Sequence, residues 1–238
     1  MIDKYEINDI MEKIKAIKEE ANQQKIEKTI LELKNPKLSF YLARYISWSD
    51  KKAHEKVVLE SKDPKYCYYF AKSIAGCDID ALKDVIIESE SAEWNYRFAK
   101  DFYTNLSALR AHERVVIDSK SLEYMYAFAS SVKGADTKTI GKIVIESKDP
   151  KFNFYFARDI SGADILAHEK VILESNDPIW NYHFAVDIGG DIDAHAKIVF
   201  NSGDKESILG FKKIYPEYSE TMKIIDKIKS IGTKGENI

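Results

Sequence analysis

The sequence is poor in the features that mark secreted and membrane-spanning proteins. Only two cysteines occur, Cys67 and Cys77, which is too few for a disulfide framework, so a reducing, cytoplasmic compartment is expected. No apolar run reaches the roughly 18 residues that a membrane span needs. The stretch 1–13 is charged from its third residue and lacks the apolar core of a signal peptide. The sequence predicts no membrane partner.

An excess of basic charge is also missing. The 36 Lys and Arg residues face 39 Asp and Glu residues, which leaves a formal net charge of −3. Proteins that coat nucleic acid usually carry a clear basic excess, so this balance argues against that class. A hydrophobic share of 45% is sufficient for a packed core and argues against global disorder.

Motifs of catalysis are lacking as well. The chain contains no Walker loop, dinucleotide fingerprint, HExxH motif or nucleophile elbow. We therefore expect a protein that is not an enzyme and that uses no cofactor. An unrecognised hydrolase or transferase is the minor alternative.

Internal repetition is the main feature that the sequence does contain. ESKDPKYCYYFAKSIAG at 60–76 returns as ESKDPKFNFYFARDISG at 146–162 and as ESNDPIWNYHFAVDIGG at 174–190. An alanine after the aromatic run and a serine before the turn both recur at intervals of 27 to 30 residues. Because the two registers agree, the chain is expected to repeat one unit of 28 residues about six times. The alanines are Ala43, Ala71, Ala99, Ala129, Ala157 and Ala185, and the serines are Ser61, Ser89, Ser119, Ser147, Ser175 and Ser202.

Each unit is predicted to form two short helices. The second helix starts at an Asx-Pro pair, because Asp and Asn are good N-caps and Pro suits the first helical position. Its end is expected at a left-handed glycine. An aspartate then caps the first helix of the next unit. The Asx-Pro pairs begin at Asn35, Asp63, Asp149 and Asp177, the glycines are Gly76, Gly134 and Gly162, and the capping aspartates are Asp78, Asp136, Asp164 and Asp191.

Helices of about 11 residues are marginal in isolation and need neighbours, which stacked units supply. At 100° per residue, Cys67, Phe70, Ala71 and Ile74 share one face of the second helix. The equivalent residues Asn153, Phe156, Ala157 and Ile160 do the same. Flanking aromatic residues widen this apolar arc, so the second helix is expected to pack between neighbours.

An alternative fold follows from the β-branched triplets in the first helices. The runs 57–59, 85–87, 115–117 and 143–145 consist mostly of Val and Ile, which favour strands. A horseshoe of strand-plus-helix repeats is therefore the second reading. The all-α reading is preferred because the charged residues before each triplet keep a helical pattern.

The ends of the chain differ from the middle. We expect an N-terminal capping helix within 1–23, with a polar amphipathic helix over 5–20, and a helical-repeat solenoid over 24–202. C-terminal capping helices are expected within 203–230, over 205–215 and 219–230 on either side of Pro216, and a flexible tail over 231–238.

This pattern resembles the α-solenoid group, the HEAT-like and tetratricopeptide-like helical repeats, over roughly 24–202. The resemblance implies a right-handed α/α solenoid. The 28-residue unit is shorter than is usual in either family, and the tetratricopeptide signature residues are missing. A nearer likeness is to short DP-x-aromatic repeats in uncharacterised proteins of AT-rich bacteria and their phages, which implies no activity. The common role of solenoids is to bind a protein, and a minority of HEAT-like proteins bind nucleic acid.

Four of the five histidines share one repeat position, which raises the possibility of a metal array. Equivalent residues of stacked helices lie about 8–10 Å apart, whereas zinc ligands come within about 2.1 Å of one ion. Leu82 and Ile140 fill the same position in other units. We therefore expect half-buried packing residues and no metal. The four histidines are His54, His112, His168 and His195.

Other candidates for chemistry have simple structural readings. Cys67 occupies the core position that holds Asn95, Met125, Asn153 or Asn181 in other units, and Cys77 replaces a small alanine. Both thiols are read as structural rather than catalytic. The paired carboxylates Asp78/Asp80 and Asp191/Asp193 are read as helix caps. The three asparagines are expected to form hydrogen bonds across repeats.

The face of the second helix opposite its core carries a recurring pair of aromatic and basic residues. Arg and Tyr are enriched at binding hot spots, so this face is the candidate partner-binding surface. An ordinary solvated helix face is the other reading, and Asp101, Asp159 and Asp187 at its edge reduce its charge. The candidate residues are Tyr41, Arg44, Tyr69, Lys72, Arg97, Lys100, Tyr155, Arg158 and His183.

Two functions are compatible with this surface. The first is a non-catalytic protein-binding solenoid, an adaptor or an inhibitor of another macromolecule, with a phage or mobile-element inhibitor as a special case. The alternative is a nucleic-acid-binding HEAT-like repeat protein that uses the same surface for stacking and phosphate contacts.

Overall fold

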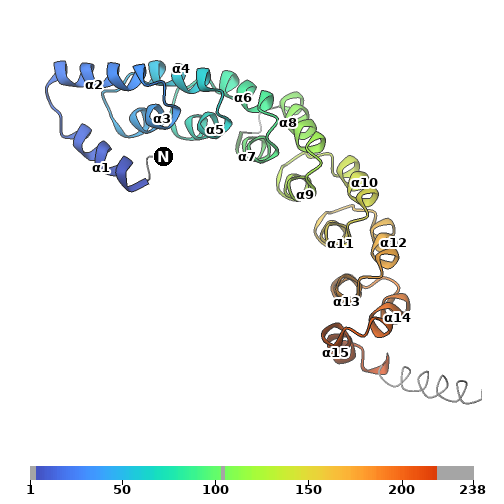
Figure 1. The fold of residues 1–238 in the computed structure, drawn as a ribbon. Coiled ribbons are helices and arrows are strands. Elements are labelled where there is room, and N and C mark those ends of the chain that lie inside the picture. Colours follow the sequence, from blue (N-terminus) through green and yellow to red (C-terminus); the bar gives the residue numbers. More distant parts are fainter. Residues whose placement is uncertain (1–3, 103–104, 219–238) are drawn as a thin grey trace, which may run out of the picture. The chain divides into compact units, whose positions relative to one another are not determined.

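The computed structural model describes residues 4–102 and 105–218, and side chains from Asp9 onward. All regular structure in these residues is helical (Figure 1). The helices are α1 (Lys4–Lys15), α2 (Glu20–Glu32), α3 (Pro36–Tyr45), α4 (Lys51–Ser61), α5 (Pro64–Ser73), α6 (Ile79–Glu88), α7 (Ala92–Phe102), α8 (Leu106–Asp118), α9 (Leu122–Ser131), α10 (Thr137–Ser147), α11 (Pro150–Asp159), α12 (Ile165–Ser175), α13 (Pro178–Asp187), α14 (Ile192–Ser202) and α15 (Lys205–Ile214).

The chain divides into two compact units, 1–135 and 136–238. In the first unit, α3, α5, α7 and α9 lie in one row and α2, α4, α6 and α8 in another. In the second unit, α11, α13 and α15 form one row and α10, α12 and α14 the other. We call these the odd row and the even row of each unit. Helices adjacent in the sequence pack in pairs, as a helical repeat requires.

Within each unit, the most extensive pairing joins an odd-row helix to the even-row helix that follows it, as in α5 with α6 and α11 with α12. The packing of an even-row helix with the next odd-row helix is smaller. The most closely packed helical hairpin therefore has the Asx-Pro helix first. The repeat unit expected from the sequence has the Asx-Pro helix second. The helices thus alternate as expected, but the tightest structural pair is shifted by one helix.

The predicted helix starts are confirmed. The side chain of Asn35 accepts hydrogen bonds from the backbone N–H groups of Lys37 and Leu38, and Pro36 is the first residue of α3. Asp63, Asp149 and Asp177 cap α5, α11 and α13 in the same way. The even-row helices α6, α10, α12 and α14 are capped by the expected aspartates, Asp78, Asp136, Asp164 and Asp191.

The prediction that a left-handed glycine ends the Asx-Pro helix is wrong. Helix α5 ends at Ser73, its C-cap Ile74 is extended, and Gly76 has a φ of +75° only in the turn beyond. Left-handed C-caps belong instead to even-row helices, such as Lys62 with a φ of 53° after α4, Asn176 with a φ of 54° after α12 and Gly203 with a φ of 76° after α14.

The repeated serine helps to hold these turns. Ser61 Oγ donates to the carbonyl of Val58 at 2.7 Å and accepts from the backbone N–H of Asp63 at 3.2 Å. One hydroxyl thereby links the end of an even-row helix to the N-cap of the next odd-row helix. The same arrangement recurs at Ser89, Ser119, Ser147, Ser175 and Ser202.

The predicted core positions are confirmed as buried. Cys67, Phe70, Ala71 and Ile74 belong to one cluster of the first unit, and the equivalent residues of α11 are buried in the second unit. The β-branched triplets lie inside even-row helices, and their central residues are fully buried. The strand-plus-helix alternative is therefore wrong for the described residues.

Of the predicted end helices, the N-terminal one is shorter in the structure, whereas α15 agrees with the helix expected over 205–215. Helix α1 ends at Lys15 and α2 begins at Glu20, so the expected 5–20 helix is shorter. Helix α15 begins after its N-cap Asp204 and packs on α13 and α14. The helix expected over 219–230 and the tail over 231–238 lie outside the described residues. Among the described helices, none has the length and apolar character required to cross a membrane.

Candidate functional site

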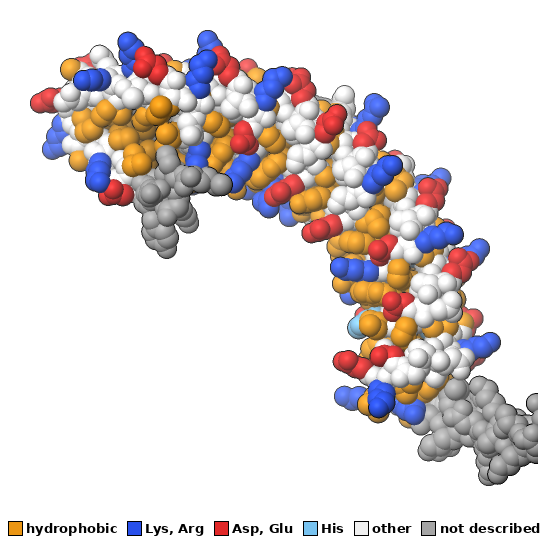
Figure 2. All heavy atoms as spheres, viewed as in Figure 1, with side chains coloured by type: hydrophobic (Ala, Val, Ile, Leu, Met, Phe, Trp, Pro, Cys, Tyr) orange, Lys and Arg blue, Asp and Glu red, His pale blue; other side chains and the backbone are white. Residues whose placement is uncertain are grey.

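All nine candidate residues lie on odd-row helices. In the first unit, α3 carries Tyr41 and Arg44, α5 carries Tyr69 and Lys72, and α7 carries Arg97 and Lys100. In the second unit, α11 carries Tyr155 and Arg158, and α13 carries His183. We refer to these two sets together as the aromatic–basic surfaces. Figure 2 shows hydrophobic side chains gathered over the odd row of each unit and charges of both signs projecting from the even row.

The aromatic members are half-buried rather than exposed, because rings of neighbouring odd-row helices contact one another. Tyr69 stacks on Phe40 with ring centroids 5.9 Å apart and meets Trp94 edge-on at 5.8 Å. In the second unit, Tyr155 meets Trp180 at 5.7 Å. Such pairs add about 0.5–1.5 kcal/mol each beyond area burial. The aromatic residues thus hold helices together as well as facing solvent.

The Arg and Lys members are exposed, and each of the five lies near an aromatic ring. The guanidinium of Arg44 lies 5.2 Å from the Tyr45 ring, and that of Arg97 lies 5.2 Å from the Trp94 ring. Arg158 lies 5.0 Å from Phe154, and Lys100 lies 5.7 Å from Tyr96. These distances fall within the range of cation–π attraction.

Several cations of these surfaces are paired with carboxylates. Lys72 Nζ lies 2.5 Å from Asp101, whose carboxylate also accepts a hydrogen bond from Tyr68. Burial alone would raise the pKa of Asp101, but the hydrogen bonds from Lys72 and Tyr68 lower it. Further ion pairs are Arg97–Glu93 at 3.0 Å and Arg158–Asp159 at 2.7 Å, and His183 Nδ1 lies 3.9 Å from a carboxylate oxygen of Asp187. The acidic residues at the edge therefore neutralise much of the basic charge.

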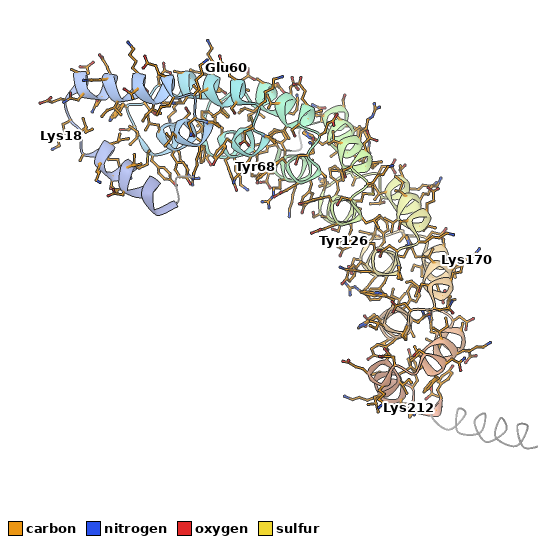
Figure 3. All side chains as sticks on the ribbon, viewed as in Figure 1. Lys18, Glu60, Tyr68, Tyr126, Lys170 and Lys212 are labelled. Atoms are coloured by element: carbon orange, nitrogen blue, oxygen red, sulfur yellow. The ribbon has the colours of Figure 1, made fainter. Side chains whose placement is uncertain are left out.

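The even row presents charged residues that pair within their own helices. Glu60 on α4 lies in the even row and Tyr68 on α5 in the odd row of the first unit (Figure 3). Even-row cations such as Lys56 and Arg114 form exposed pairs with acidic residues four positions along the same helix. Because such pairs are worth only about 0.3–0.5 kcal/mol, these residues make suitable controls for the odd-row surface.

The four repeated histidines are fully buried, whereas half-burial was expected. His112 Nδ1 lies 2.7 Å from Asn95 Oδ1, and His168 Nδ1 lies 2.7 Å from Asn153 Oδ1. His195 makes the same contact with Asn181. Each asparagine also donates to a carbonyl of the preceding even-row helix, as Asn95 does to Ile86 at 2.8 Å. The predicted hydrogen bonds of the asparagines across repeats are confirmed.

The identity of the histidine position follows the asparagine position, a relation that the sequence analysis missed. Where Asn stands on the odd-row helix, His stands on the next even-row helix. Where Cys67 replaces Asn, Leu82 replaces His, and both are fully buried in one apolar cluster. Met125 and Ile140 hold the same two positions in the sequence. Comparing the two positions between repeats could have revealed this pairing.

One of the four histidines lacks an asparagine partner. The residue equivalent to asparagine before His54 is Ser39, and both are fully buried. Among the described residues, neither Ser39 Oγ nor His54 Nδ1 has a hydrogen-bond partner. The shorter side chain does not reach the ring.

The remaining candidates lack signs of catalysis or metal binding. Burial raises the pKa of the Cys67 thiol to about 12, which disfavours the nucleophilic thiolate. Burial also raises the pKa of Cys77. Within the part of the chain that the structure describes, no three His, Cys, Asp or Glu side chains gather as a metal site.

Comparison of the chain with protein-family models, curated proteins and solved structures finds no match in any of the three.

Proposed function

We propose that the chain is a non-catalytic protein-binding solenoid, an adaptor or an inhibitor of another macromolecule, which binds through its aromatic–basic surfaces. The proposal includes a right-handed α/α solenoid of about six 28-residue repeats with atypical helical ends. The starts of α3, α5, α7, α9, α11 and α13, which lie 28 or 30 residues apart, support that repeat count.

The observation that carries the proposal is the combination of partly exposed aromatic rings with exposed Arg and Lys groups beside them. Aromatic and Arg side chains dominate binding hot spots because they offer broad contact area and hydrogen bonds at a small entropic cost. Rings already packed on one another, such as Phe40 and Tyr69, lose little further freedom when a partner binds.

Nucleic-acid binding is the alternative function, and Arg44 and Lys100 favour it. Among the described residues, neither has an acidic partner within ion-pair distance, although each lies beside a ring. The pairing of Lys72, Arg97 and Arg158 with carboxylates opposes it, since phosphate groups would have to compete with those carboxylates. Binding through phosphate contacts would weaken steeply with salt as counterions are released.

The test is capture of partners from the source lysate, with and without nuclease. The wild type is compared with an Arg44→Ala/Arg97→Ala/Arg158→Ala variant of the odd row. The matched control is a Lys56→Ala/Arg114→Ala/Lys170→Ala variant, which removes three exposed cations from the even row. Both variants lower the charge equally.

We expect a protein that survives nuclease treatment, is retained by the even-row variant and is lost with the odd-row variant. Equal capture by both variants would show that the proposed surface is wrong. Capture that nuclease abolishes, with affinity falling steeply between 50 and about 200 mM salt, would favour nucleic acid as the ligand.

A further inference from the structure

A glutamate carboxylate joins successive even-row helices at several points. Glu27 Oε1 accepts a hydrogen bond from the backbone N–H of Asp50 at 2.5 Å, and Glu169 Oε1 accepts one from Asp191 at 2.5 Å. Glu55 accepts from Asp78 in the same way. Each donor is the N-cap residue of the next even-row helix, where a negative charge is favoured.

The same carboxylates approach a histidine. Glu169 Oε1 lies 3.3 Å from His195 Nε2, and Glu27 Oε1 lies 3.5 Å from His54 Nε2. In these repeats, one carboxylate therefore lies next to both a backbone N–H and the Nε2 atom of an imidazole.

Gly141 occupies this glutamate position in the second unit, 28 residues before Glu169. Because glycine has no side chain, a pocket forms between α10, α11 and α12, and its lining includes Lys138, Lys142, Phe156 and His168. The glutamate side chain that fills this space in other repeats is replaced here by glycine. The groups that the glutamate would contact, the N-cap N–H and the histidine ring, are still present.

The polar groups at the pocket lack internal partners. His168 is 1% exposed, and its Nδ1 is held by Asn153. No described residue forms a hydrogen bond with its Nε2 or with the backbone N–H of Asp164, the counterpart of Asp191. The Nε2 atoms of His112 and His195 also lack a hydrogen-bond partner, but they are enclosed by protein, whereas that of His168 borders the pocket.

The pocket is also positively charged. Lys138 and Lys142 line it, and neither pairs with an acidic side chain among the described residues. Asp164 is the acidic residue of the lining, and its Oδ1 accepts a hydrogen bond from Ala167 N at 3.1 Å.

We propose that the Gly141 pocket binds one carboxylate group, supplied by a small molecule or by an acidic side chain of another chain, in the place of the repeat's own glutamate. One oxygen accepts from the Asp164 N–H, Lys138 and Lys142 attract the charge, and an oxygen lies beside His168 Nε2. This site is distinct from the aromatic–basic surfaces and does not depend on their function.

Binding is expected to take up one proton. Asn153 Nδ2 donates to the carbonyls of Val144 and Asp149 at 2.9 and 2.8 Å, so its Oδ1 accepts and His168 Nδ1 carries the ring proton. Nε2 then presents a lone pair, and a carboxylate oxygen beside it needs a proton between them.

The charged groups that face this ring come from two helices. Helix α10 contributes Lys138 and Lys142, and the start of α12 contributes Asp164, while α11 presents Asn153 and Phe156, which do not titrate. Burial keeps the pKa of His195 below its ordinary value even beside Glu169, so acetate affinity should rise as the pH is lowered below about 6.5.

The test is a titration of the full chain with sodium acetate at constant ionic strength, followed by NMR signals of the Asp164 amide and the His168 ring. We expect saturable shifts with an affinity on the order of millimolar, because so small a ligand cannot bind much more tightly. Shifts that sodium chloride reproduces would overturn the proposal.

The decisive variant is Gly141→Glu, which restores the internal carboxylate and should abolish acetate binding. A Cβ at this position meets Phe156 Cε1 at 3.0 Å, so the ring must move slightly. Glu55 with Phe70 and Glu169 with Phe184 show the same sequence separation, and each of these phenylalanines is fully buried. Acetate binding unchanged in a folded Gly141→Glu protein would contradict the proposal.

A second variant leaves the buried residues intact. Lys138→Ala/Lys142→Ala should weaken acetate binding about twofold to fivefold per lysine removed, whereas the control Lys170→Ala should not change it. Equal affinities in all three proteins would count against the site. Competition by N-acetylglutamate amide would identify an acidic side chain as an acceptable source, and binding of acetate alone would identify a small carboxylate.

Discussion

Two neighbouring junctions of the first unit solve the same packing problem with different chemistry. Between α5 and α6, Cys67 and Leu82 form an apolar junction, and both side chains are fully buried. Between α7 and α8, Asn95 and His112 form a polar junction that is buried almost as completely. Even the backbone partner is equivalent, since Cys67 Sγ approaches the Val58 carbonyl as Asn95 Nδ2 approaches that of Ile86.

This comparison shows that the two positions act as a pair. A buried polar group costs about 1–3 kcal/mol when its partner is removed, whereas replacing both partners by apolar groups can be nearly neutral. In the described repeats Asn accordingly occurs with His, whereas the apolar Cys67 and Met125 occur with Leu82 and Ile140; Ser39 with His54 is the exception. The predictions that follow test this pairing.

The largest difference between the junctions should appear in acid. Burial lowers the pKa of His112 and His168 to about 4, from an ordinary value near 6.5. Because the unfolded chain binds protons below pH 6.5 and the folded rings do not, the free energy of unfolding should fall as pH drops from 6.5 towards 4. The loss is about 1.4 kcal/mol per pH unit for each histidine, and the full contribution is present above pH 6.5.

Urea unfolding at pH 7.5, 6.0 and 5.0 measures this loss. The control is the Asn95→Cys/His112→Leu protein, whose pH dependence should be shallower by the equivalent of one proton. Identical pH dependences in the two proteins would show that His112 is not responsible.

A single polar group in the apolar junction should be nearly as costly. Leu82→His buries an imidazole opposite Cys67, which offers no strong acceptor, and should lower the free energy of unfolding by about 3 kcal/mol. Adding Cys67→Asn should recover at least half of that loss, as measured by the urea midpoint. A double variant as unstable as the single one would contradict the pairing.

The reverse exchange should be milder. Asn95→Cys and His112→Leu should each cost about 2 kcal/mol, because each leaves one buried polar group unpaired. The double variant should cost less than the sum, with a coupling energy of about 1 kcal/mol from a double-mutant cycle. Additive losses would mean that the two side chains contribute independently.

The smallest effect is expected at the incomplete junction of Ser39 and His54. Ser39→Asn should supply the acceptor that His54 Nδ1 lacks and raise the free energy of unfolding by about 1 kcal/mol. Thermal unfolding measures the change, with Ser39→Ala as the control that adds no acceptor. Destabilisation by Ser39→Asn would indicate that the larger side chain does not fit there.

Much of the fold could be predicted from short-range patterns. The Asp63-Pro64 pair marks a helix start because capping and the fixed φ of proline act within one turn. The phase of Phe70 and Ala71 identifies the buried face for the same reason, since helical geometry is local. The spacing of the repeated serines likewise predicts the positions of the turns, which the serine hydroxyls stabilise.

The candidate surface was only partly predictable. The sequence placed Tyr69 and Arg97 on one face of their helices, but not that the Tyr69 ring would be half-buried between Phe40 and Trp94. Helical phase also does not predict the ion pair between Lys72 and Asp101, because Asp101 lies on another helix. Such contacts depend on the spacing and rotation of neighbouring helices.

The helical class, the repeat period, the N-caps and the buried face of the odd-row helices follow from the order of the residues, because each depends on interactions within a few residues. Three other features became visible only in the folded chain: the helices that form the closest hairpins, the full burial of His112 against Asn95, and the pocket that Gly141 leaves beside His168. These features depend on residues about 15 to 28 positions apart, whose proximity is created by packing.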